Sequence, residues 1–186
     1  MEFYLHYDGP LKANGNIRDK HHLREQFHAQ LSVLWGQVPL APDIGGLLSY
    51  PPAKNSLSVI MKRSEFTFAP LVCEKLALVC ELDITFLRPE APGAVITQGG
   101  DIDNRLKTLF DGLRIPRVPD EIPSGFAPIE NDKPFFCLLE DDNLITRVNV
   151  ATGRLLRENA GQNEVVLLIK ITTKAVKAIW ANLGLG

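Results

Sequence analysis

The segment LALVCELDITFL, residues 76–87, places the strongest constraint on the fold. Its apolar residues recur at every second position, and polar residues fill most of the positions between them. This period of two is typical of a β-strand with one buried and one solvent-facing side. We therefore predict a strand whose core face carries Leu76, Leu78, Cys80, Leu82, Ile84 and Phe86, and whose exposed face carries Glu81, Asp83 and Thr85.

Weaker patterns predict the remaining elements. Strands are expected where short segments are rich in β-forming residues, at 2–7, 56–61, 65–68, 144–150 and 165–171, and an apolar run at 135–139 leads into an acidic segment. Helices are expected where apolar residues recur at helical spacing, at 18–35 and 101–113, with a short third helix at 175–182. This order predicts an α+β (mixed α/β) fold: a single small sheet with helices packed on it, in one domain spanning residues 1–186.

The composition is that of an ordinary globular protein, with 45% apolar and 23% charged residues. No apolar run approaches the roughly 20 residues that a membrane-spanning helix needs, and the N-terminus does not have the pattern of a signal peptide. The three cysteines form no CxxC pair, which argues against a zinc knuckle and a disulfide framework and favours a cytoplasmic location. A net charge of −2 and a pI of about 6.1 count against indiscriminate nucleic-acid binding, although a local basic patch remains compatible with them.

The densest chemical signal is GGDIDNRLK, residues 99–107. Asp101 and Asp103 flank one apolar residue, and a helix would place Asp103 and Lys107 on one face. Neighbouring carboxylates repel each other unless a cation lies between them, and their hard oxygens suit Mg²⁺ or Mn²⁺. With a nearby lysine, such a site could hydrolyse a phosphodiester. The alternative is an ordinary helix start, because aspartate is favoured there as a cap and by the helix dipole.

A second acidic cluster, Glu140-Asp141-Asp142, follows the apolar run 135–139. Side chains alternate along a strand, so at most one of the two aspartates would face a site formed by the helix start. A solvated acidic turn is the alternative interpretation of this cluster.

Together, these segments resemble the RusA family of Holliday-junction endonucleases. The resemblance covers about residues 76–171 and rests on the strand, the glycine-rich turn, D-I-D-N-x-x-K with D-G-L on a helix, and the apolar run into D-D. It implies a small mixed fold, a homodimer, Mg²⁺ dependence and symmetric nicking of four-way DNA junctions. It also implies residue roles: metal ligation by Asp101, Asp103 and Asp142, catalysis by Lys107, an accessory role for Asp141 in metal binding, and structural roles for Asn104 and Asp111.

Basic residues cluster near the N-terminus, where Lys12, Arg18, Lys20 and Arg24 are the candidate DNA contacts. A dimer would present this patch twice and could grip phosphates on two DNA arms. A solvated helix face is the alternative. Histidines at 21, 22 and 28 do not have the spacing of a zinc-binding helix.

Two functions remain open at this point. The first is a Mg²⁺-dependent, structure-selective endonuclease that resolves branched DNA in recombination or repair. The second is a module with the same fold that binds DNA or a protein without cutting. The proline-rich loop at 114–134 joins the two acidic segments, and we expect it to pack outward, along a subunit interface or as a flap.

Overall fold

The computed structural model describes residues 1–42, 46–51, 57–90, 102–126 and 134–186. Within these ranges it contains two α-helices and seven strands, which confirms the predicted α+β class. None of the described helices is long and apolar enough to cross a membrane. The helices are α1 (Ile17–Trp35) and α2 (Ile102–Leu113), and the strands are β1 (Glu2–Pro10), β2 (Met61–Arg63), β3 (Phe66–Val72), β4 (Leu78–Arg88), β5 (Phe135–Leu139), β6 (Ile145–Arg154) and β7 (Glu164–Ala175).

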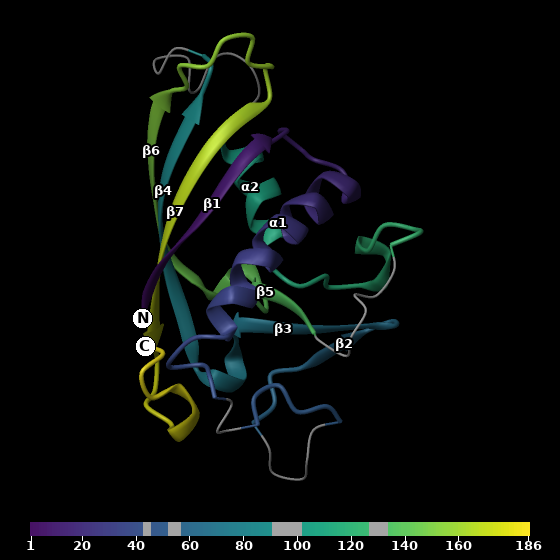
Figure 1. Cartoon of the computed structure of the whole chain (residues 1–186), viewed down its shortest axis with the longest axis vertical. Coiled ribbons are helices and arrows are strands. Elements are labelled where there is room, and N and C mark those ends of the chain that lie inside the picture. The colour runs from purple at the N-terminus through teal and green to yellow at the C-terminus, as the bar shows by residue number, and fades with distance from the viewer. Residues whose placement is uncertain (43–45, 52–56, 91–101, 127–133) are drawn as a thin grey trace.

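The strands form two sheets, so the prediction of a single sheet was wrong. One sheet has the order β1-β7-β4-β6, and the other has the order β2-β3-β5 (Figure 1). Both edges of β4 are occupied, by β7 in antiparallel and by β6 in parallel orientation. Strand β3 belongs to the other sheet, where it pairs with β5 in parallel and with β2 in antiparallel orientation.

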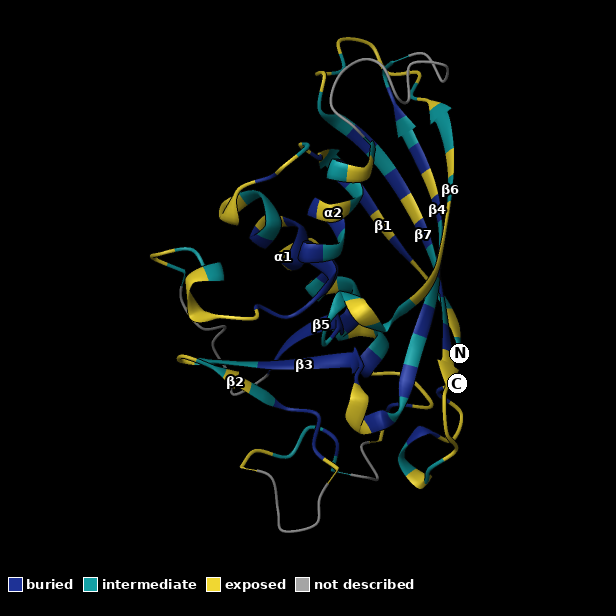
Figure 2. Ribbon diagram, turned by 180° about the vertical axis from the view of Figure 1, so that it is seen from behind, coloured by how far each residue is buried: buried dark blue, intermediate teal, exposed yellow. Residues whose placement is uncertain are grey.

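Strand β4 confirms the predicted alternation. Its core-facing residues are at most 2% exposed, and they lie beside the buried residues of β7, with Leu82 opposite Ile171. Figure 2 shows the alternation along both strands as bands of different burial. Both helices cover this apolar face, and in the described part of the chain no helix lies on the opposite face of the four-stranded sheet (Figure 1).

Helix α1 begins with a capping box, in which Asn16 and Asp19 satisfy each other's backbone N–H groups. Its buried side packs against α2 at Gly112. A Cβ atom placed on Gly112 would lie 2.7 Å from Cβ of Leu23, well inside van der Waals contact. The two helices therefore approach closely because this position of α2 has no side chain.

Two of the predicted elements differ from the structure. Residues 57–60 are not a strand, and β2 begins only at Met61. The expected helix at 175–182 reduces to a 3-10 turn, η5 (Trp180–Asn182), because β7 continues to Ala175 through pairing with Leu78 of β4. Trp180 is 89% exposed, whereas Trp35 is buried in the core.

Candidate functional site

The exposed side of α2 carries one half of the candidate site. Asp103 lies in the first turn, and its carboxylate accepts a hydrogen bond from the backbone N–H of Asn104 at 2.8 Å. A carboxylate at this end of a helix is also favoured by the helix dipole. Lys107 follows one turn later on the same side, and both side chains are exposed. Neither forms an ion pair with another described residue.

The other half is the 3-10 turn η4 (Asp142–Leu144), which follows β5. Asp141 caps this turn by accepting the N–H of Asn143 at 3.1 Å. The guanidinium of Arg117 donates to both oxygens of Asp141, at 2.8 and 3.2 Å, and to Oδ1 of Asp142 at 2.7 Å. The hydrogen bond from Arg117 is the main reason that the pKa of Asp141 falls to about 2. Asp141 is therefore ionised at neutral pH and fixes both η4 and Arg117.

The fold places the turn η4 next to helix α2. Positions 103, 107, 110 and 114 follow one another along a single side of the helix. At the end of this stripe, Arg114 forms a bridge with Leu139, and the N–H of Ile115 donates to the Leu139 carbonyl at 2.9 Å. Asp142 is three residues beyond Leu139, so it lies near the C-terminal end of α2, whereas Asp103 lies in the first turn of the same helix.

Asp101 lies outside the described residues, so Asp103 and Asp142 are the described members of the predicted metal set. No three His, Cys, Asp or Glu side chains come close enough to hold a metal ion in the part of the chain that the structure describes. The chemistry of the donors nevertheless suits a divalent cation, because carboxylate oxygens are the ligands that Mg²⁺ prefers. The guanidinium on Asp142 is itself a cation that this carboxylate attracts.

A buried ionic network supports the end of α2. Asp111 is 7% exposed and binds Lys20 at 2.7 Å and Arg114 at 2.6 Å, which agrees with its expected structural role. Arg114 also binds Glu121, in the 3-10 turn η3 (Pro119–Glu121). Burial raises the pKa of Asp111, but its partners Lys20 and Arg114 bring the net result below the usual value.

The described part of the loop at 114–134 is attached to the core at both ends. Residues 114–116 are buried, and Phe126 packs on the ring of His21 at a centroid distance of 4.0 Å. The acidic Glu121 is neutralised internally by Arg114. Residues 117–120 are exposed, and packing of the loop along a subunit interface or as a flap stays a prediction. Residues 127–133 lie outside the described part.

The predicted basic patch is only partly available to DNA. Lys12 binds Asp19 at 2.8 Å and Lys20 binds Asp111, whereas Arg18 is exposed and forms no ion pair within the described residues. The assignment of Arg24 to this patch was wrong, because its side chain is 2% exposed. Its guanidinium donates to the carbonyls of Arg114 at 2.9 Å and Asp111 at 2.8 Å, so it closes the C-terminal end of α2.

A second arginine bridges two carboxylates on the helix-free face of the four-stranded sheet. Arg147 of β6 binds Glu81 at 3.0 Å and Asp83 at 3.1 Å. Its side chain is 51% exposed, close to the 49% of Arg117. The chemistry of the two arginines is therefore similar, but α2 covers the opposite face of the sheet from Arg147.

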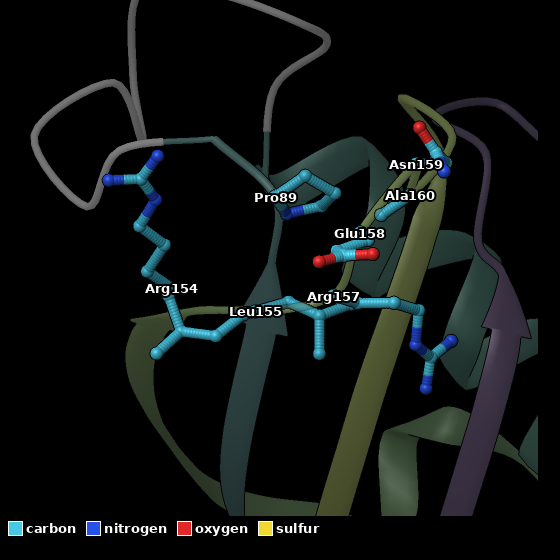
Figure 3. Close-up of a pocket in the computed structure, with 8 residues that line it drawn as sticks. Pro89, Arg154, Leu155, Arg157, Glu158, Asn159 and Ala160 are labelled. Atoms are coloured by element: carbon cyan, nitrogen blue, oxygen red, sulfur yellow. The ribbon is translucent and has the colours of Figure 1, made fainter.

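An open hollow of about 480 Å³ lies near the far end of the four-stranded sheet, between Pro89 and residues 154–160 (Figure 3). Figure 3 shows the side chains of Arg154 and Arg157 pointing away from each other. The guanidinium of Arg157 is held by Asp8 at 2.6 and 2.8 Å. Among the described residues that line the hollow, the two arginines do not converge as the polar groups of a catalytic site would.

Comparisons with protein-family models, curated proteins and solved structures found no match to this chain. The sequence interpretation missed Arg117, the residue in closest contact with the acidic pair at 141–142. A usable signal was present, because Arg114 and Arg117 begin a loop whose following charged residues are acidic up to position 132. Such cations need acidic partners, although the pattern does not reveal that the partners of Arg117 lie at 141–142.

Proposed function

We propose that this chain is a metal-dependent endonuclease that cuts branched DNA such as a four-way junction. The observation that carries the proposal is the packing of α2, with exposed Asp103 and Lys107, against the turn that begins at Asp142. Two acidic segments far apart in the sequence thus belong to elements that contact each other, and one of these elements also carries the lysine. The resemblance of the same segments to the RusA family supplies the substrate class.

The described residues divide into two roles. Asp103 and Asp142, with Asp101 as the third carboxylate implied by the resemblance, would hold Mg²⁺ or Mn²⁺. When bound, the ion would supply an activated water and neutralise charge on the scissile phosphate. Lys107 lies one helical turn from Asp103 and would donate to a phosphate oxygen as negative charge develops there. Asp141 would stabilise η4 and hold Arg117, so it would not be a ligand itself.

The experiment is cutting of a labelled four-way junction in Mg²⁺ and in Mn²⁺. We expect Asp103→Asn, Asp142→Asn and Lys107→Ala each to lower the rate by about a hundredfold or more while the fold is retained. Asp83→Asn is the matched control, because it removes a carboxylate from the helix-free face of the sheet. Cutting in excess chelator, or undiminished cutting by the site variants, would refute the proposal.

A non-catalytic DNA- or protein-binding module is the second candidate. It is favoured by Arg117, which already neutralises Asp141 and Asp142, and by the internal ion pairs of Lys12 and Lys20. The same cutting assay distinguishes the two functions. A chain that binds the junction without cutting in Mg²⁺ or Mn²⁺ is the outcome that this candidate predicts.

We further propose that the active form is a homodimer. A four-way junction presents two equivalent strands, and a two-fold assembly would place one site on each. Light scattering at micromolar concentration tests this proposal. A monomer that nonetheless cuts both strands symmetrically would contradict it.

A further inference from the structure

The contact between Arg117 and Asp142 has a consequence for metal binding. One nitrogen of the guanidinium, Nη2, lies 2.7 Å from Oδ1 of Asp142 and also 3.2 Å from Oδ1 of Asp141. This contact uses one lone pair of Asp142, and other lone pairs of the carboxylate remain for a metal, so any competition between the two cations is mainly electrostatic. The guanidinium and the metal are also both cations, so they repel each other at short distance.

We propose that Arg117 is the internal counter-ion of Asp142 and that it competes with a divalent cation for this carboxylate. The inference rests on the proposed function, since it assumes a metal site that includes Asp142. It adds a residue that the resemblance does not provide, and it assigns opposite effects to two neighbouring side chains. Arg117 weakens metal binding by competition, whereas Asp141 strengthens it by holding Arg117 back.

The geometry of Asp141 explains how release can occur without loss of the arginine. Nε of Arg117 donates to Oδ2 of Asp141 at 2.8 Å, independently of the nitrogen that contacts Asp142. A rotation of the guanidinium about this bond would move Nη2 away from Asp142 and keep the hydrogen bond from Nε to Asp141. Asp141 is in turn fixed by the N–H of Asn143, so the pivot is attached to η4 itself.

The size of the effect follows from exposure. Arg117 is 49% exposed and Asp142 is 35% exposed, so solvent screens their attraction. Exposed ion pairs are worth about 0.2–1 kcal/mol, which corresponds to a change of up to about fivefold in a binding constant. The competition should therefore be measurable and should weaken at high salt.

The test is Mn²⁺ affinity of the whole chain, measured by calorimetry without DNA. We expect Arg117→Ala to tighten Mn²⁺ binding by about two- to fivefold. Arg117→Lys keeps the charge but loses the paired donors of the guanidinium, so we expect it to give a smaller increase in Mn²⁺ affinity. Arg147→Ala is the control, because it removes an equally exposed arginine from two carboxylates on the other face of the sheet. It should leave the Mn²⁺ affinity unchanged within error.

A double-mutant cycle separates this role of Asp141 from metal ligation. We expect Asp141→Asn to weaken Mn²⁺ binding in the wild-type chain and to have a clearly smaller effect when Arg117 is already alanine. An equal loss in both backgrounds would make Asp141 a direct ligand and overturn the inference.

The failures of the two proposals are distinguishable. If the wild-type chain binds no Mn²⁺, the proposed function fails and the inference fails with it. If the wild-type chain binds Mn²⁺ and Arg117→Ala binds it no more tightly, only the inference is overturned. Circular dichroism checks that each variant is folded. If Arg117→Ala does not fold, Arg117→Gln is used instead, because it keeps a hydrogen-bond donor for Asp141.

Discussion

His21 should make the stability of this protein depend on pH. Its ring is 3% exposed and packs between Phe126 and Phe135. Nδ1 lies 3.2 Å from Nη1 of Arg24, which can only donate, so Nδ1 accepts and the neutral ring carries its proton on Nε2. Within the described part of the chain, Nε2 has no hydrogen-bond partner. Burial, and secondarily the charge of Arg24, lowers the pKa of His21 from 6.5 to about 4.

The direction of the pH dependence follows from the pKa of His21 in the unfolded and in the folded chain. Between pH 6.5 and 4 the unfolded chain binds a proton at His21 and the folded chain does not, so acidification favours unfolding. The contribution of the neutral His21 ring to the free energy of unfolding is fully present above pH 6.5. This contribution is lost progressively as the pH falls toward 4. A difference of 2.5 pKa units corresponds to about 3 kcal/mol, a large fraction of the stability of an ordinary domain.

Urea unfolding at constant ionic strength, from pH 8 to pH 4.5, measures this loss. His21→Phe should remove most of the dependence, whatever its stability at pH 8, because no titrating ring remains at that position. A smaller slope should persist, since burial also lowers the pKa of His28. The exposed neighbour His22 is the control, and His22→Phe should retain the full slope. An unchanged slope in His21→Phe would show that carboxylates dominate this pH range and that the reasoning is wrong.

Two further predictions concern the junction of the helices. Arg24→Met should lower the free energy of unfolding by about 3 kcal/mol, because the carbonyls of Arg114 and Asp111 lose their buried donor. Urea unfolding measures this change. A change below about 0.5 kcal/mol, which is usual for surface substitutions, would contradict the assignment of Arg24 to the core. Gly112→Ala should lower it by about 1 kcal/mol, since overpacking against Leu23 costs about 1–3 kcal/mol and the gain in helix propensity offsets up to about 1 kcal/mol. A stabilised Gly112→Ala protein would mean that α1 and α2 separate more easily than their contact indicates.

The local patterns of this sequence predicted the elements that depend on local physics. The alternation at 76–87 identified β4 and its buried face, and the helical spacing identified α1 and α2 to within one residue at each described end. The number of sheets was not predictable in this way. It depends on which strand edges are already occupied, and the parallel pairing of β3 with β5 joins segments that are far apart in the chain.

The same distinction between local patterns and tertiary contacts applies to the candidate site. Asp103 and Lys107 belong to one helical turn, so their common side follows from spacing alone. The environment of Arg24 depends on tertiary contacts, because its position next to Leu23 on the helix does not reveal that α2 ends above it. Arg117 was missed for the same reason, since its partners at 141–142 approach it only after β5 has paired with β3.

Buried arginines also change what the net charge of the chain means for DNA binding. Among the described residues, Arg24, Arg88, Arg105 and Arg114 are buried, whereas Asp111 is the one buried carboxylate. The surface is therefore more acidic than the formal charge of −2 indicates. Long-range electrostatic attraction to DNA phosphates cannot supply the binding affinity of this protein. An acidic protein and the phosphates repel each other beyond the range of individual contacts. If the chain cuts DNA as proposed, binding must rely on a few local cations and on the divalent ion itself, and affinity for a junction should fall sharply when the metal is removed.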